Sequence, residues 1–285
     1  MTPQSFEAFA ACLRAGSGLV IGPDKIYLLE TRLGRILMQE NLRDLDALAG
    51  RLATARGTAL ERDVIEAMTT NESYFFRDDK PFTHFRSHAL PRLLAARPPS
   101  ARLRLWSAAS SSGQEAYSLA MILTECRAQV AGRHVEILGT DISREQLTRA
   151  REGLYTQFEV QRGLPMQYLV RYFRKDGANW RTNDTLRAMA SFREWNLLGD
   201  LRVLGQFDVV FCRNVLIYFD HPTKARVLEA IARQMSPDGL LYLGGAETVL
   251  GITDRLVASP GERGVYELAG VAHPARAGAA MARVS

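Results

Sequence analysis

Apolar residues recur at helical spacing through the first 85 residues. Ile26, Leu29, Leu33, Ile36 and Leu37 stand at positions i, i+3, i+7, i+10 and i+11, which is the pattern of an amphipathic helix. Asp24 is placed to cap this helix. With further helices expected at 5–15, 44–55 and 58–68, we predict an all-helical N-terminal domain over residues 1–85.

The pattern changes after residue 101, where short apolar runs alternate with amphipathic segments. We expect strands at 103–108, 135–139, 207–212, 239–243 and 265–268, and helices at 115–126, 143–151 and 222–235. Such alternation forms parallel βαβ units in a doubly wound sheet. The fold class is therefore α/β, with a Rossmann-like domain at 102–270 and a linker at 86–101. Residues 265–268 should close the sheet as an edge strand.

The alternation is lost between about residues 155 and 195. The pieces 172–175, 180–183 and 186–194 are predicted to form a small antiparallel β-subdomain. The tail at 271–285 is rich in Ala, Gly and Arg, which predicts disorder.

Composition excludes several classes of protein. There are 36 basic and 31 acidic residues and a net charge of +5, without the dense basic block of a nucleic-acid groove. No apolar run approaches the roughly 20 residues that span a bilayer. The 3 cysteines and 5 histidines are scattered, so we expect no metal site. A secretory pattern is also missing at the N-terminus, so we expect a cytoplasmic protein. We further expect a monomer.

Candidate ligand residues follow the first two predicted strands of the sheet. Ligands of doubly wound sheets bind beyond the carboxyl ends of the strands, and the small residues 107–113 would let a ligand approach there. Asp141 could hold ribose hydroxyls. Glu115 would repel a phosphate but suits an ammonium group, although the helix dipole also favours an acid in a first turn. The loop has one glycine, Gly113, so an adenosine with a cationic amino-acid arm, as in S-adenosylmethionine, fits better than NAD.

Two further segments combine polar tips with aromatic rings. Residues 71–77 read Asn-Glu-Ser-Tyr-Phe-Phe-Arg, and residues 211–220 read Phe-Cys-Arg-Asn-Val-Leu-Ile-Tyr-Phe-Asp. The first suits a flat, partly cationic ligand, with aromatics for stacking, or is simply a helix end whose rings pack in a core. The second should bring Arg213, Asn214 and Tyr218 to the carboxyl edge of the sheet.

These segments, with 112–118, 139–142 and Asn196-Leu197, occur in the order found in the CheR family, which the chain resembles over about residues 10–268. The resemblance implies an S-adenosylmethionine-dependent methyltransferase for glutamate side chains of chemoreceptors, with S-adenosylhomocysteine as product. Gln114 and Ala116 depart from the residues frequent in the family.

The resemblance also implies roles for individual residues. Two would act in catalysis, Arg77 beside the substrate carboxylate and Tyr218 beside the transferred methyl. The cofactor would be bound by Asn71, Ser73, Arg77, Glu115, Asp141, Asn196, Leu197, Arg213 and Asn214. The short β-subdomain indicates a member that does not depend on a receptor pentapeptide.

The partner is expected to be the cytoplasmic helical region of chemoreceptors, which is rich in acidic residues. Arg32 and Arg35, on the predicted second helix, are the docking candidates, unless they are ordinary solvated arginines. Two other functions stay open. One is a non-catalytic module that binds S-adenosylmethionine for regulation, and the other is a methyltransferase for another acceptor.

Overall fold

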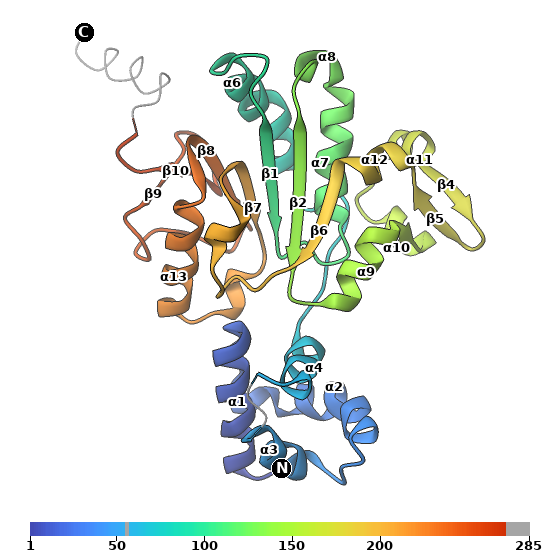
Figure 1. The fold of residues 1–285 in the computed structure, drawn as a ribbon, viewed down its shortest axis with the longest axis vertical. Helices are drawn as coiled ribbons and strands as arrows, with labels where there is room; N and C mark the ends of the chain where they lie inside the picture. Colours follow the sequence, from blue (N-terminus) through green and yellow to red (C-terminus); the bar gives the residue numbers. More distant parts are fainter. Residues whose placement is uncertain (55–56, 272–285) are drawn as a thin grey trace.

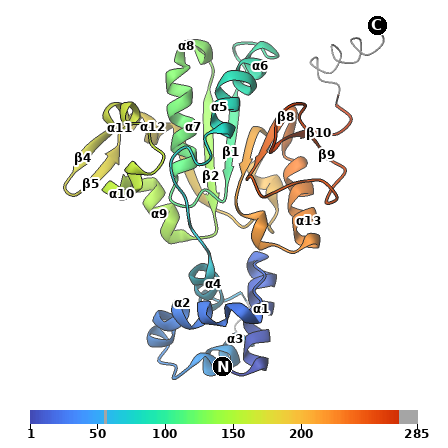
Figure 2. The same cartoon turned by 180° about the vertical axis from the view of Figure 1, so that it is seen from behind.

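The computed structural model describes residues 1–54 and 57–271, which form a helical part below a larger part built on a sheet (Figures 1 and 2). The helical part contains α1 (Pro3–Ser17), α2 (Ile26–Gln39), α3 (Leu45–Leu52) and α4 (Ala59–Met68). Its core is made of apolar side chains at helical spacing, such as Phe9, Leu13, Leu29, Leu33 and Leu48. The predicted helical character of this region is confirmed.

Side chains cap the starts of three of these helices, but the start of α2 differs from its prediction. The side chains of Thr2, Asp44 and Thr58 accept backbone N–H groups at the starts of α1, α3 and α4. The predicted cap at Asp24 is wrong. Asp24 lies inside a short 3₁₀ turn, η1 (Pro23–Lys25), which starts at the preceding proline. Lys25 therefore holds the N-cap position of α2.

A seven-stranded sheet organises the larger part, in the order β6-β2-β1-β7-β8-β10-β9. Its strands are β1 (Leu103–Ala108), β2 (Val135–Asp141), β6 (Ala190–Glu194), β7 (Phe207–Cys212), β8 (Met235–Leu243), β9 (Leu256–Ala258) and β10 (Val265–Leu268). The strands from β6 to β8 pair in parallel. Ala108 stands opposite both Thr140 and Cys212, so the loops after β1, β2 and β7 leave the sheet at one edge.

Helices cover both faces of this sheet (Figures 1 and 2). Alternate residues point to opposite faces of a strand. Accordingly, Leu105 belongs to the core that contains α7, and Trp106 to the core that contains α13. The covering helices and turns are α5 (Lys80–His84), η2 (Phe85–Ala89), α6 (Leu90–Ala95), α7 (Gln114–Glu125), α8 (Arg127–Val130), α9 (Arg144–Glu152), α12 (Asp184–Met189), η3 (Leu201–Leu204), η4 (Leu216–Tyr218) and α13 (His221–Ala232).

The small antiparallel sheet is confirmed, but its predicted extent is wrong at one end. It consists of β3 (Leu154–Tyr155), β5 (Asn179–Thr182) and β4 (Phe173–Asp176), with α10 (Gln157–Gln161) and α11 (Met166–Tyr172) beside it. Residues 186–194 do not join it. They complete α12 and then form β6, which pairs in parallel with β2 at the edge of the main sheet. Polar residues alternate along β6, as they do both in an edge strand and in an antiparallel sheet. This pattern explains why the strand was expected in the small sheet.

Two further expectations differ from the structure. β10 is not the edge strand, because β9 pairs with its outer side. The predicted linker at 86–101 is helical from Phe85 to Ala95, and Phe85, Leu90 and Leu93 lie in the core of the main sheet. The extended connection between the parts is instead the segment after α4. The predicted disordered tail lies outside the described residues except for Val271, and none of the described helices could cross a membrane.

Candidate functional site

A cleft lies between the helical part and the carboxyl edge of the main sheet. Its lining includes ten residues that the sequence singled out, and these come from five separate segments: Asn71, Ser73, Arg77, Glu115, Asp141, Asn196, Leu197, Arg213, Asn214 and Tyr218. The strand register explains this convergence, since β1, β2 and β7 end side by side.

A buried ion pair forms one wall of the cleft. The Glu115 carboxylate, in the first turn of α7, accepts the Ser107 hydroxyl at 2.7 Å and the Arg213 guanidinium at 3.1 Å. Only 2% of the Arg213 side chain is exposed. The same guanidinium donates to the Arg77 carbonyl oxygen and to Asp78, at 2.8 and 2.7 Å. Arg213 therefore fixes both Glu115 and the backbone that carries Arg77.

The segment that carries Arg77 has an unusual backbone. Phe76, Asp78 and Asp79 all have positive φ, at 50°, 65° and 44°, a conformation that costs energy in non-glycine residues. The Arg213 bonds described above oppose this cost. The Arg77 guanidinium donates to the Glu72 carbonyl oxygen at 2.8 Å. Arg77 is therefore fixed at its tip by this bond and at its backbone by Arg213.

The aromatic rings of residues 74–76 divide between the core and the cleft. Phe75 is fully buried and packs edge-on against Tyr155 and Phe173, and Phe76 packs against Phe82. Only Tyr74 lines the cleft. The expectation that all three rings stack on a ligand is therefore wrong, and the core-packing alternative holds for two of them.

Asp141 is held by backbone amides at the end of β2. Its two carboxylate oxygens accept the N–H groups of Ser111 and Ser143, at 2.8 and 2.9 Å. Burial raises the pKa of Asp141, and the nearby Glu66 carboxylate adds to the rise, although the amide bonds act in the opposite direction. The bonds to Ser111 and Ser143 fix the carboxylate at the floor of the cleft.

Sequence reasoning missed Glu247, which organises the loop after β7. Its buried carboxylate accepts the four backbone amides of residues 214–217 and that of Gly244, at 2.7 to 3.3 Å. Asn214 has a φ of 58° within this loop, and Tyr218 follows it. An acidic residue shortly after the Gly-Gly pair that follows β8 was the available signal.

The helical part supplies the opposite wall, which the sequence did not predict. Ser17, the last residue of α1, and Leu19, just after the helix, line the cleft. The Asn196 amide donates to the Gly16 carbonyl oxygen at 2.5 Å, and the Val20 amide to the Tyr218 carbonyl oxygen at 3.0 Å. The end of α1 thus closes the cleft over two of the predicted cofactor loops.

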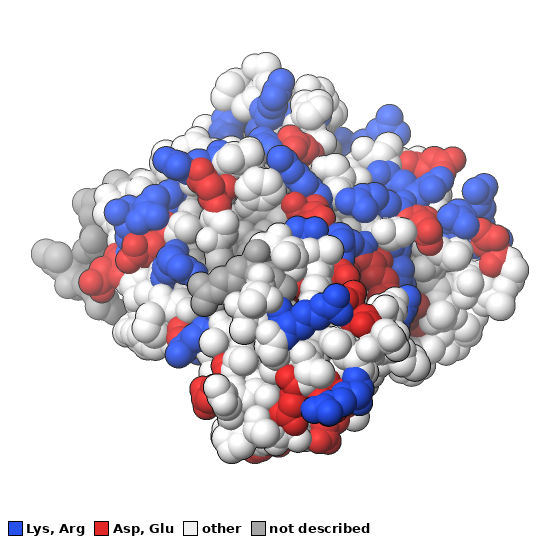
Figure 3. All heavy atoms as spheres, turned by 60° about the horizontal axis from the view of Figure 1, so that its bottom comes forward, with Lys and Arg blue, Asp and Glu red and all other residues white. Residues whose placement is uncertain are grey.

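The two predicted docking arginines lie outside this cleft, on α2, along a neighbouring groove. Arg32 is half-buried and donates to the carbonyl oxygens of Met68 and Thr69, both at 2.9 Å. Arg35 is exposed. Basic and acidic side chains are interspersed on the face drawn in Figure 3. The two arginines differ in their surroundings. Arg32 is bonded to the segment that leads into the cleft, whereas Arg35 is exposed.

Several buried polar atoms of the cleft have no partner within the described part of the chain. They are Ser110 Oγ, Trp195 Nε1 and Asn214 Oδ1. Buried polar groups are normally hydrogen-bonded, so these atoms are suited to a ligand with both donors and acceptors. Together with the Glu115 and Asp141 carboxylates, they fit the amino, hydroxyl and base groups of S-adenosylmethionine. No cluster of metal-ligating side chains occurs among residues 1–54 and 57–271.

Comparison with known proteins gives the family. Residues 71–265 match the family described as CheR methyltransferase, SAM binding domain. The chain is 40% identical over 263 residues to chemotaxis protein methyltransferase 1 of Pseudomonas aeruginosa, with 90% of this chain and 95% of that protein covered. It is 37% identical to chemotaxis protein methyltransferase Cher2 of Pseudomonas putida, with the same coverage. With chemotaxis protein methyltransferase 1 of Vibrio cholerae the identity is 37%, and 90% and 93% are covered. The chain therefore belongs to the CheR family of S-adenosylmethionine-dependent methyltransferases.

Proposed function

We propose that this protein methylates glutamate side chains in the cytoplasmic helical region of chemoreceptors, in the cytoplasm and as a monomer. The observation that carries the proposal is the placement of Arg77. Arg77 lines the same cleft as Glu115 and Asp141, so a cationic residue for a substrate carboxylate lies beside a site suited to the cofactor. The names of the curated relatives support chemotaxis as the setting.

The cofactor roles follow the chemistry of the cleft. Glu115 would bind the methionyl ammonium, and Asp141 the ribose hydroxyls. The ribose and adenine would lie against three loop residues, Asn196, Leu197 and Asn214. Asn71 and Ser73 would close the site from the segment that follows α4. Arg213 would act through Glu115 and the Arg77 backbone rather than through a bond of its own to the cofactor.

The reaction needs no general base. A glutamate carboxylate is already ionised near neutral pH. When bound, S-adenosylmethionine supplies a methyl group made electrophilic by its sulfonium, and transfer to the carboxylate oxygen leaves a γ-glutamyl methyl ester and S-adenosylhomocysteine. Arg77 orients the carboxylate, and Tyr218 lies beside the reacting groups. The contribution of these residues is alignment and exclusion of water.

Receptor recognition would involve α2 and would not require a receptor pentapeptide. Arg35 is exposed and can attract an acidic helix, whereas Arg32 is already bonded to the end of α4. β4 and β5 are joined by only two residues, Gly177 and Ala178, which leaves no long loop for a peptide. A receptor fragment without its C-terminal pentapeptide should therefore be methylated as fast as the complete one.

Calorimetric titration with S-adenosylhomocysteine tests the cofactor site, and transfer of labelled methyl to a receptor cytoplasmic fragment tests the acceptor. We expect micromolar binding that Asp141→Ala abolishes and that exposed Asp254→Ala leaves unchanged. Binding without transfer would favour a non-catalytic regulatory module, or a methyltransferase for another acceptor. A folded protein that does not bind S-adenosylhomocysteine would refute the proposal.

A further inference from the structure

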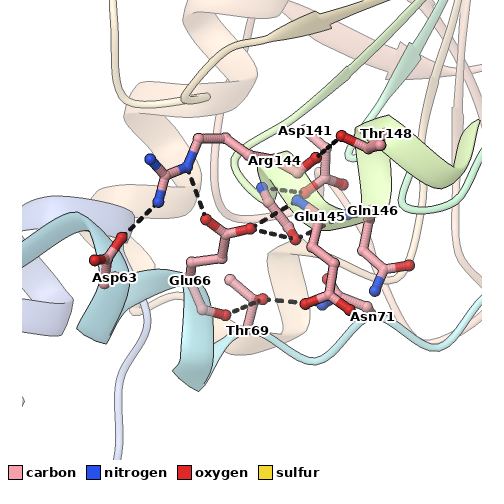
Figure 4. A network of polar contacts seen from close by, with 10 residues as sticks. Asp63, Glu66, Thr69, Asn71, Asp141, Arg144, Glu145, Gln146 and Thr148 are labelled. Carbon is pink, nitrogen blue, oxygen red and sulfur yellow. Dashed lines mark hydrogen bonds and ion pairs between the residues drawn. The ribbon is translucent and has the colours of Figure 1, made fainter. Parts of the chain in front are cut away.

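Glu66, on the last turn of α4, reaches across to the sheet-based part of the molecule (Figure 4). Its Oε1 accepts the Ser143 hydroxyl at 3.0 Å and the Glu145 backbone amide at 2.9 Å. Its Oε2 accepts the Arg144 Nε at 3.0 Å, and Arg144 also pairs with Asp63 at 2.5 Å. One carboxylate of the helical part thus contacts three consecutive residues at the start of α9.

These three residues follow directly on the cofactor floor. Ser143 is the N-cap of α9, and its backbone amide donates to Asp141 Oδ1 at 2.9 Å. The first amides of a helix lack partners within the helix and need acceptors from elsewhere. At α9, Ser143 provides one for Gln146, at 3.3 Å, and Glu66 provides one for Glu145. Ser143, which is buried, therefore links the two carboxylates directly. Its hydroxyl donates to Glu66, and its backbone amide donates to Asp141.

The backbone of Glu66 contacts the other side of the same cleft. Its carbonyl oxygen accepts the Thr69 hydroxyl at 2.7 Å, and Thr69 Oγ1 accepts the Asn71 amide at 3.1 Å (Figure 4). Asn71 and Asp141 both line the cleft, whereas Glu66 does not. A single turn of α4 is therefore bonded to both sides of the cofactor site without touching its interior.

We propose that Glu66 is a positioning residue that couples the helical part to cofactor affinity, by holding the start of α9 and through it Asp141. The inference rests on the proposed cofactor site. The essential bonds are those to Oε1, because the Arg144 pair on Oε2 is exposed and exposed ion pairs contribute little. Movement of α4 on receptor docking would then change the affinity for the cofactor, and the bound cofactor would reciprocally stabilise the docked position.

Three substitutions separate the two halves of this carboxylate. Glu66→Ala removes both oxygens. Glu66→Gln keeps an acceptor that can take the Oε1 position and loses the ion pair. Arg144→Ala loses the ion pair with Glu66 and the one with Asp63, and leaves the acceptor bonds of Oε1 in place. We expect Glu66→Ala to raise the Kd for S-adenosylhomocysteine, and the KM for S-adenosylmethionine, about tenfold, as for the loss of one hydrogen bond to a charged group, with kcat changed by less than about threefold. Glu66→Gln and Arg144→Ala should stay within about threefold of wild type in all three constants.

The outcomes are distinct from those that test the proposed function. If the wild type fails to bind S-adenosylhomocysteine, the proposed function itself falls. If the wild type binds and Glu66→Ala binds equally well, only the role of Glu66 is refuted. If Glu66→Ala, Glu66→Gln and Arg144→Ala all raised the Kd by the same factor, the role would also be refuted, because the ion pair would then carry the effect. Should Glu66→Ala fail to fold, Glu66→Asp, one methylene too short to keep these bonds, should raise the Kd and not kcat. An unchanged Kd in this variant would overturn the proposal.

Discussion

The two walls of the cleft are built in different ways. On the sheet wall, the side chains of Glu115, Asp141 and Glu247 are bonded mostly to buried partners, many of them backbone amides. On the helical wall, a few contacts join α1 and α4 to the sheet-based part, and several of these are exposed. Buried hydrogen bonds have a large cost when one partner is lost. The sheet wall is therefore suited to hold a cofactor precisely, and the helical wall to respond to a partner.

Glu247→Ala should cause the largest loss on the sheet wall. It leaves the amides of residues 214–217 and Gly244 without their acceptor. Even if water reaches some of them, we expect unfolding to become easier by about 4 kcal/mol, with loss of S-adenosylhomocysteine binding. Urea unfolding and calorimetry measure the two effects. Glu229→Ala, on the exposed face of α13, is the control, and equal stability of both variants would contradict the role of Glu247.

Arg77→Ala should separate catalysis from folding. The side chain is bonded to the Glu72 carbonyl oxygen and contacts Tyr74, while Arg213 holds the backbone independently of the side chain. We expect methyl transfer to fall about 100-fold, as for other charged groups that orient reacting atoms, with S-adenosylhomocysteine affinity within a few-fold.

The matched control for Arg77 is Arg162→Ala. Arg162 stacks on the same Tyr74 ring, at 4.3 Å from its centroid, and pairs with Glu72, but it does not line the cleft. A comparable loss of activity in both variants would mean that the arginines act by supporting Tyr74. Near-normal turnover in folded Arg77→Ala would exclude a role in orienting the substrate.

The sequence predicted the sheet wall better than the helical wall, for a physical reason. Register brings the ends of neighbouring strands together, so Glu115, Asp141 and Arg213 could be grouped from their positions after predicted strands. The packing of α1 on Asn196 depends on contacts 180 residues apart, which no local pattern encodes. The β6 strand was assigned to the small sheet because local alternation does not identify the partner strand. Phe75 shows the same limit, since sequence order alone does not tell a core ring from a ligand ring.

Charge reversal on α2 should affect receptor docking at Arg35 and the cleft at Arg32. Arg35→Glu is expected to raise the KM for a receptor fragment several-fold, with the effect reduced at high salt, and to leave S-adenosylhomocysteine binding unchanged. Arg32→Glu loses the bonds to Met68 and Thr69 and should weaken S-adenosylhomocysteine binding too. If both substitutions gave the same pattern, the distinction between the two arginines would be wrong.

The buried floor of the cleft should appear in the pH dependence of stability. Burial raises the pKa of Asp141 above its ordinary value of 3.8, so in the window just above that value the folded state binds more protons than the unfolded state. Stability then decreases as pH rises through this window. The free energy of unfolding of the wild type should therefore fall relative to that of Asp141→Asn, measured by urea unfolding at stepped pH. A difference that is constant or of opposite sign would contradict the raised pKa.

The smallest expected effect belongs to the exposed ion pair between Arg14 of α1 and Asp220, where Nε lies 2.8 Å from Oδ2. Hydrogen bonds from Thr223, and then Arg14, lower the pKa of Asp220 to about 2. The stability that the ionised Asp220 contributes is therefore complete above about pH 4 and is lost as pH falls through about 2. Arg14→Ala should cost about 0.5 kcal/mol at neutral pH and less at high salt, because Asp220 keeps its cap on α13. The control is Arg233→Ala, which breaks an exposed pair with Glu229 at the C-terminal end of α13. A loss well above that of the control would mean that the helical wall is held as firmly as the sheet wall, and the contrast between them would fail.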